Sequence, residues 1–237
     1  MTATLLHARG LCAGYGGMPM LREIDLNVRR GEIVALVGSN GAGKTTLLRA
    51  LSRLIDSTGE VAFEGRQIGA LTPEQVFGLG LVQVPEGRQL FDQMTVHENL
   101  LMGARRGASK TELREALERV YAVFPPLAKR RRLRAGSMSG GEQQMCAVAR
   151  ALMAAPSLLM IDEMSLGLAP IMVDQLRDVL LEIRRQGVTV LLVEQDVHFA
   201  FELADRGYVI ENGEIVREGS ARSLADDPEI RRAYFGL

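Results

Sequence analysis

The sequence predicts an α/β protein with a mainly parallel sheet, an N-terminal antiparallel β part and an inserted helical part. Apolar runs at 33–37, 157–162 and 188–194 have the length and continuous hydrophobicity of strands covered on both faces. A glycine-rich turn leads from the first run directly into a helix-forming segment. From residue 72 to about 156, helix starts predominate, which indicates a helical insert in the α/β core.

The N-terminal part is expected to form antiparallel strands. Segments 5–11 and 23–28 are strand candidates, and the second alternates apolar with polar residues, as in a half-buried strand. Segment 61–63 is a further short strand of the same kind.

Capping boxes mark the helix starts of the middle part. Thr72, Thr95 and Ser109 each precede a Glu or Gln by three residues, so side chain and backbone can cap each other. Near the C-terminus, Asn212-Gly213 between apolar stretches predicts a hairpin over 207–219 with a type I′ turn. We expect one domain over 1–237, with its core at about 1–85 and 156–237 and the helical insert at about 86–155.

Composition excludes several classes of protein. A net charge of −1 over 237 residues gives no overall attraction to nucleic acid. The apolar stretches are strand-sized, short of the roughly 20 residues that cross a bilayer. No N-terminal export leader is visible. Cys12 and Cys146 lack metal-type spacing, and we expect free thiols in a reducing compartment.

A phosphate-binding loop follows the first buried strand. The segment matches G-x-x-x-x-G-K-[ST] between a strand and a helix, the context in which this motif binds nucleotide phosphates. Lys44 would supply a positive charge, and the Thr45 hydroxyl would ligate Mg²⁺. The fold is thus expected to be a P-loop NTPase core. The predicted nucleotide-binding residues of this loop are Gly38, Ser39, Asn40, Gly41, Ala42, Gly43, Lys44, Thr45 and Thr46.

Two acids follow the strand at 157–162 and predict the second half of the site. Asp162 comes at the carboxyl end of this strand, where open α/β sheets bind ligands, and would hold Mg²⁺. Glu163 would polarise the attacking water as general base. The alternative, a strand end with two solvated acids, fits less well beside a phosphate loop.

A second glycine-rich segment, Ser139-Gly140-Gly141-Glu142-Gln143, opens another helix candidate. Ser139 and Glu142 form a capping box, so the segment reads as a well-capped helix start. Two glycines in a first helical turn nevertheless cost stability. They are explained if a phosphate approaches the backbone there.

These motifs, in this order, resemble the ATP-binding-cassette (ABC) ATPases over essentially the whole chain. The resemblance implies two nucleotide domains that meet head to tail, with ATP and Mg²⁺ between the phosphate loop of one and the signature of the other. Ser139, Gly140, Gly141, Glu142 and Gln143 would then face ATP held by a partner subunit. Tyr15 falls where the family stacks an aromatic ring on adenine, although it could equally be a turn residue.

The chain departs from the common family pattern at several positions, including the segment 165–170, which replaces the more common Ser-Ala-Leu-Asp loop. Glu86 stands in the loop between core and insert where Gln is usual, and an anion near phosphate is expected to face Mg²⁺, water or the adjacent Arg88. Gln195 replaces the usual switch histidine and would sense the γ-phosphate without carrying a charge. Met164 follows Glu163 where Pro is common.

Several segments together resemble the ATPase subunits of branched-chain amino-acid importers, among them Pro-Glu-Gly-Arg at 85–88 and Ser-Leu-Gly-Leu-Ala-Pro at 165–170. This implies ATP hydrolysis coupled to transport at the cytoplasmic face of a bacterial-type membrane. The implied partners are two transmembrane permease subunits, a second identical or homologous ATPase subunit and, indirectly, an extracytoplasmic solute-binding protein. Importers of urea or amides are similar enough to remain an alternative.

Other ABC ATPases fit less well. DNA-maintenance members carry a long coiled coil between the two glycine motifs, and no sustained heptads occur here. The basic run 129–134 reads as a solvated face, or as a contact to lipid headgroups. Phe77, Phe91, Met94 and Phe124 line either a groove for a permease helix or the ordinary core.

Overall fold

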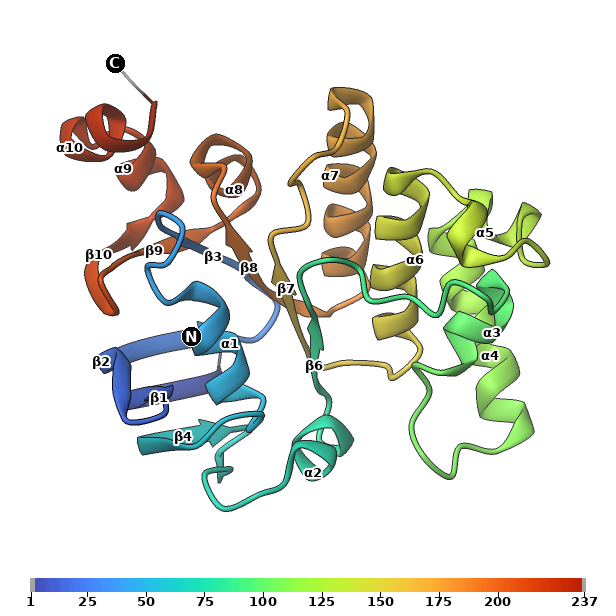
Figure 1. Cartoon of the computed structure of the whole chain (residues 1–237), viewed down its shortest axis with the longest axis horizontal. Helices are drawn as coiled ribbons and strands as arrows, with labels where there is room; N and C mark the ends of the chain where they lie inside the picture. Colours follow the sequence, from blue (N-terminus) through green and yellow to red (C-terminus); the bar gives the residue numbers. More distant parts are fainter. Residues whose placement is uncertain (1–2, 236–237) are drawn as a thin grey trace.

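The computed structural model describes residues 3–235 and contains two sheets (Figure 1). Residues 1, 2, 236 and 237 of the expected core lie outside the described part. The smaller sheet is antiparallel, with strand order β2-β1-β4-β5. Its strands are β1 (Thr4–Tyr15), β2 (Met18–Arg29), β4 (Ser57–Phe63) and β5 (Arg66–Gln67).

The larger sheet has the order β10-β9-β3-β8-β7-β6 and is parallel except for its edge strand β10. The expected hairpin is present, since β10 pairs with β9 through Asn212 and Gly213, whose φ angles are 49° and 82°. The strands are β3 (Ile33–Val37), β6 (Leu81–Val84), β7 (Leu158–Asp162), β8 (Thr189–Glu194), β9 (Arg206–Glu211) and β10 (Glu214–Ser220).

Most of the helices between β6 and β7 stand together to the right of the sheets in Figure 1, with α7 next to them. The four predicted capping boxes all form, at Thr72, Thr95, Ser109 and Ser139. The helices are α1 (Lys44–Leu51), α2 (Pro73–Gly78), α3 (Val96–Leu101), α4 (Lys110–Val123), α5 (Pro125–Lys129), the 3₁₀ turn Ala135–Ser137, α6 (Gly140–Leu152), α7 (Pro170–Arg185), α8 (Val197–Leu203), α9 (Ala221–Ala225), α10 (Pro228–Ile230) and the π turn Arg231–Phe235.

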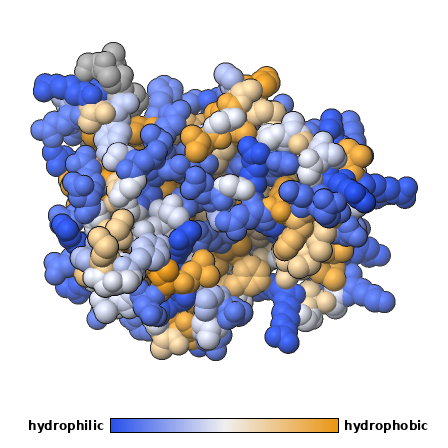
Figure 2. Space-filling model, viewed as in Figure 1, coloured by the Kyte–Doolittle hydropathy of each residue, from blue (hydrophilic) through white to orange (hydrophobic). Residues whose placement is uncertain are grey.

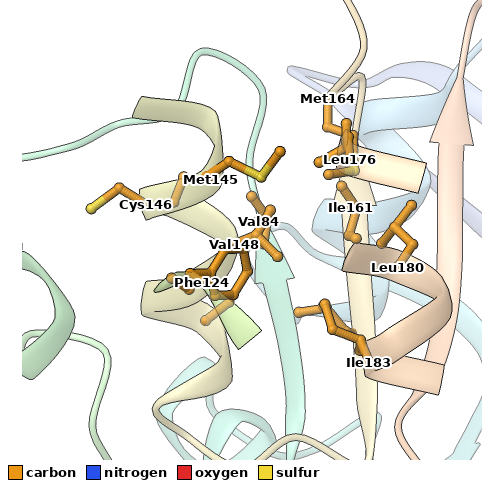
Figure 3. Packing of buried hydrophobic residues seen from close by; sticks show 14 of the residues in the cluster. Val84, Phe124, Met145, Cys146, Val148, Ile161, Met164, Leu176, Leu180 and Ile183 are labelled. Atoms are coloured by element: carbon orange, nitrogen blue, oxygen red, sulfur yellow. The ribbon is translucent and has the colours of Figure 1, made fainter. Parts of the chain in front are cut away.

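Alternate residues of each buried strand pack into different apolar clusters. On β7, Leu159 and Ile161 join the cluster formed with α4, α6 and α7, part of which Figure 3 shows. Leu158 and Met160 point to the opposite cluster, formed with α1 and the antiparallel sheet. The parallel sheet is thus covered on both faces, which explains its continuous apolar strands.

The first strand is longer than the sequence pattern indicates. β1 continues past residue 11 because the chain accommodates Gly10 as an irregularity, with φ 57° and a shift in register against β2. Both cysteines are free thiols. Within residues 3–235, the helices are too short or too polar to span a lipid bilayer.

Asn99 on α3 fixes the connection from β6 to α3. Its side chain is fully buried, accepts a hydrogen bond from Phe91 N at 2.9 Å and donates to Phe91 O at 3.0 Å and Thr95 O at 3.1 Å. A buried amide that satisfies several backbone groups leaves them unpaired when it is removed.

We expect Asn99→Ala to lower the free energy of unfolding by about 2–4 kcal/mol, measured by urea denaturation. Gln93→Ala, at an exposed position of the same connection, is the control and should change stability by less than about 0.5 kcal/mol. Equal effects of the two substitutions would contradict a special role of Asn99.

Candidate nucleotide-binding site

The phosphate loop joins β3 to α1 and requires glycine for two different reasons. Gly43 has φ 110°, and a Cβ there would lie 2.8 Å from Leu21 Cδ2. A Cβ on Gly38 would lie 2.3 Å from the carbonyl oxygen of Ile210. The loop is therefore wedged between β2 and β9, and it begins and ends on rigid elements.

Lys44, the first residue of α1, folds back over this loop. Its side chain is buried, and Nζ donates to Gly38 O at 2.8 Å and to Ser39 O at 3.2 Å. The same ammonium forms an ion pair with Glu163 Oε1 at 3.0 Å. Lys44 thus connects the phosphate loop to the residue that follows β7.

Asp162 ends β7 as a buried carboxylate, and neither of its oxygens accepts a hydrogen bond of normal geometry. Burial raises the pKa of Asp162 to about 6, the carboxylates of Glu163 and Glu86 act in the same direction, and Thr45 and Lys44 oppose them. A buried carboxylate whose oxygens lack a hydrogen bond of normal geometry would be stabilised by a hard cation that prefers oxygen ligands.

Glu163 follows in a conformation that few non-glycine residues adopt, with φ 45°. Its backbone N–H donates to Val193 O at 2.8 Å, so β8 holds the turn. The side chain is 10% exposed at the floor of a pocket. The residues around this pocket are Met20, Asn40, Gly41, Gly43, Lys44, Thr45, Thr46, Glu86, Glu163 and Leu166.

The structure brings most of the predicted nucleotide-binding residues to this pocket and leaves others outside it. Glu86 lies at its rim, exposed, on the loop after β6. Gln195 is exposed directly after β8, outside the described lining of the pocket. Tyr15 is 41% exposed at the end of β1, and its hydroxyl accepts a hydrogen bond from Arg49 at 3.2 Å.

The predicted signature residues start α6 and lie beside a different groove, between α5, α6 and α7. Ser139 Oγ accepts from Glu142 N at 3.4 Å, and Glu142 accepts from Ser139 N at 3.0 Å. Gln143 accepts from Arg88 Nη1 at 2.9 Å, which ties α6 to the loop that carries Glu86. Gly140 packs against the same guanidinium, and Gly141 against Met172.

Two contacts of the site were not predicted from the sequence. Glu194 is buried at the end of β8 and accepts hydrogen bonds from Ser165. Arg130 forms an ion pair with Glu142 at 2.8 Å. The only signal for Glu194 was an acid that ends an otherwise apolar strand.

Comparison with known proteins gives a consistent result. The model of the ABC transporter family matches residues 21–165. The chain belongs to the ABC transporter family. It is 44% identical to the high-affinity branched-chain amino acid transport ATP-binding protein BraG of Pseudomonas aeruginosa, over 94% of this chain and 95% of BraG. It is 33% identical to the probable branched-chain amino acid transport ATP-binding protein LivF of Archaeoglobus fulgidus, over 98% of this chain and 99% of LivF.

Solved structures agree with this family. A nucleotide-free ATP-binding cassette from an ABC transporter superposes with a TM-score of 0.88 at 26% identity, covering 99% of this chain and 100% of that one. The ADP conformation of an ATP-binding cassette gives 0.85 at 27% identity, with full coverage of both chains. The fold class, the family and the ATPase activity expected from the sequence are confirmed.

The buried carboxylate of Asp162 makes a prediction about stability and pH. Because its pKa in the folded protein is about 6, above the ordinary 3.8, folding binds protons between these values. The contribution of Asp162 to the free energy of unfolding is therefore fully present below about pH 4 and is lost as the pH rises to 6. At 1.36 kcal/mol for each tenfold change in proton affinity, the loss is about 3 kcal/mol.

We expect Asp162→Asn to raise the melting temperature of the nucleotide-free protein at pH 7.5–8 and to have little effect near pH 4. Differential scanning calorimetry across this range measures the difference. Asp226→Asn, at an exposed position, should change stability by less than about 0.5 kcal/mol throughout. A less stable Asp162→Asn protein at pH 8 would contradict the electrostatic interpretation.

Proposed function

We propose that this chain is the ATP-hydrolysing subunit that drives a membrane importer of branched-chain amino acids. The observation that carries the hydrolytic part is that Lys44 and Glu163 pair in one pocket beside the phosphate loop, and that the buried carboxylate of Asp162 ends the strand directly before Glu163. The solute class rests on the similarity to BraG and LivF over nearly the whole chain.

Residues 38–46 would bind the triphosphate of ATP, with backbone N–H groups and the start of α1 facing the phosphate oxygens. Thr45 and Asp162 would hold Mg²⁺, with Glu86 at the rim; the unpartnered oxygens of Asp162 fit this assignment. Bound there, the ion would neutralise part of the phosphate charge. Tyr15 would stack on the adenine, and its exposed position at the end of β1 leaves the ring free to do so.

Glu163 would be the general base for the attacking water. In the structure its carboxylate is paired with Lys44. Phosphate oxygens would take its place beside the ammonium, because they are the stronger anionic partner. The carboxylate of Glu163 would then be free to accept a proton from water. Gln195 would donate an uncharged hydrogen bond to the γ-phosphate.

The catalytic unit would be a head-to-tail pair of cassettes, because the phosphate loop and the start of α6 lie at different grooves of one chain. Ser139, Gly140, Gly141, Glu142 and Gln143 would then contact ATP held by the second cassette. That cassette would be a second copy or a homologous chain.

A permease subunit would dock in the groove after β6, at the cytoplasmic face of the membrane. Phe77, Gln89, Phe91 and Met102 line this groove, and Phe91 and Met102 are 46% and 56% exposed. Figure 2 shows apolar surface gathered on this face, over the region of β6 and α2. Exposed apolar surface next to polar residues is suited to binding a partner helix.

We expect Glu163→Gln to lower ATP turnover at least 100-fold while ATP binding stays within a few-fold of wild type, since the amide keeps the shape but cannot accept the proton. Phosphate release and binding of a fluorescent ATP analogue measure the two quantities on the same preparation. Glu182→Gln is the control, because Glu182 lies on α7 with its side chain 40% exposed and outside the described lining of the pocket. Turnover within tenfold of wild type would exclude Glu163 as the base.

The transport role has its own test. We expect the tagged chain, solubilised from membranes in mild detergent, to retain polytopic permease subunits, and Phe91→Asp to lose them. Leu133→Asp is a matched control, because Leu133 is 45% exposed but lies outside the described groove. Uptake of labelled leucine, with urea as competitor, distinguishes the solute classes. Retention of no membrane protein by wild type would overturn the transport role.

A further inference from the structure

The first residues of the loop after β7 are held by hydrogen bonds and burial, and most of the residues that follow are exposed. Glu163 N–H donates to Val193 O at 2.8 Å, and the Met164 side chain is fully buried in the same apolar cluster as Leu176 (Figure 3). From residue 166 onward the loop is largely exposed, with Leu166 at 56% and Gly167 at φ 70°. Ser165 therefore ends the first, well-attached part of the loop, and beyond it Leu168 packs against the core and its N–H donates to Ser165 O at 3.2 Å.

Glu194 holds Ser165 through two hydrogen bonds. Its Oε1 accepts from Ser165 N at 3.1 Å and its Oε2 from Ser165 Oγ at 2.7 Å. The backbone of Glu194 pairs with Val37, the residue before the phosphate loop. Glu194, at the end of β8, thus contacts both the strand that leads into the phosphate loop and the loop that carries Glu163.

Burial at the position of Glu194 removes a carboxylate from water, which destabilises its charged form. Its side chain is buried at the end of a strand whose preceding residues are apolar apart from Thr189. Burial raises the pKa of Glu194 to about 7, the carboxylates of Glu163 and Asp196 act in the same direction, and the two bonds from Ser165 oppose them. An apolar side chain would avoid this cost but could not hold Ser165.

We propose that Glu194 is a positioning residue for ATP hydrolysis, which holds Ser165 and thereby keeps Glu163 oriented toward the nucleotide pocket. The proposal rests on the proposed role of Glu163 as general base. Glu163 lies two residues before Ser165 and adopts φ 45°, a conformation that persists only when its surroundings enforce it. Releasing Ser165 would let this turn relax and would move the carboxylate away from the attacking water.

The hydrogen-bonding pattern predicts which substitutions are tolerated. In Glu194→Gln the carbonyl oxygen can accept from Ser165 N, and the amide can donate to Ser165 Oγ. Glu194→Ala removes both bonds. Ser165→Ala removes only the bond from Oγ and keeps the backbone bond.

The experiment measures kcat, ATP affinity and amide exchange on the full chain, together with whichever partner chains wild type is isolated with. We expect Glu194→Ala to lower kcat at least tenfold with ATP affinity within twofold of wild type. Glu194→Gln should stay within threefold of wild type, and Ser165→Ala should be intermediate. The variant that combines Glu194→Ala with Ser165→Ala should be no slower than Glu194→Ala alone, because both substitutions act on the same contact between Glu194 and Ser165.

Amide exchange reports on the attachment without requiring hydrolysis. Hydrogen–deuterium exchange of the segment 164–170 should speed up in Glu194→Ala and stay unchanged in Asp196→Asn. Asp196 is the matched control, since its side chain caps α8 through Phe199 N at 3.0 Å and asparagine caps equally well.

Four results would overturn the proposal: turnover of Glu194→Ala within twofold of wild type, unchanged exchange of 164–170, a parallel loss of ATP affinity, or Glu194→Gln as slow as Glu194→Ala. A different result would show that Glu163 is not the general base. Glu163→Gln, assayed alongside, would then hydrolyse ATP like wild type, whatever happens at Glu194.

Discussion

The buried ammonium of Lys44 is the interaction on which the arrangement of the site depends. A cation inside a protein needs anionic or carbonyl partners, and this one finds two carbonyls of the phosphate loop and the carboxylate of Glu163. The partners directly follow β3 and β7, two strands that are separated by β8 in the sheet. In the proposed mechanism, phosphate oxygens would replace Glu163 beside the ammonium, and the same exchange that binds ATP would free the proposed base. Binding of ATP and release of Glu163 would then be one event.

Four acids lie at the carboxyl ends of β6, β7 and β8 or in the loops that follow these strands. Asp162 and Glu194 are buried, Glu163 is nearly so, and Glu86 stands at the rim. Burial raises the pKa values of Asp162 and Glu194, because each loses the solvation that a carboxylate has in water. So many acids would repel a bare triphosphate. The electrostatics therefore suit a nucleotide that arrives together with a divalent cation.

The sequence predicted the features that depend on local patterns. The buried strands, the capping boxes and the Asn212-Gly213 hairpin are each encoded within a few consecutive residues, and the structure contains them. The placement of Asp162 beside the phosphate loop also followed, because parallel strands end at one edge of a sheet.

Contacts between neighbouring strands of the sheet could not be predicted from local sequence patterns. The bond between Glu194 and Ser165 joins residues 29 apart, and it forms only because β7 and β8 are neighbours in the order β10-β9-β3-β8-β7-β6. No local pattern in the sequence specifies that order. The pairing of Lys44 with Glu163 depends on it in the same way.

The start of α6 raises an electrostatic difficulty that the basic run 129–134 resolves. In the proposed pair of cassettes, a phosphate of the second cassette's ATP approaches the first turn of α6, where Glu142 already occupies the helix N-terminus. A bare carboxylate there would repel the phosphate at short range. Glu142, however, accepts from Ser139 N at 3.0 Å and is paired with Arg130 at 2.8 Å. The acid therefore caps the helix with its charge compensated, and the positive end of α6 stays available to an incoming anion.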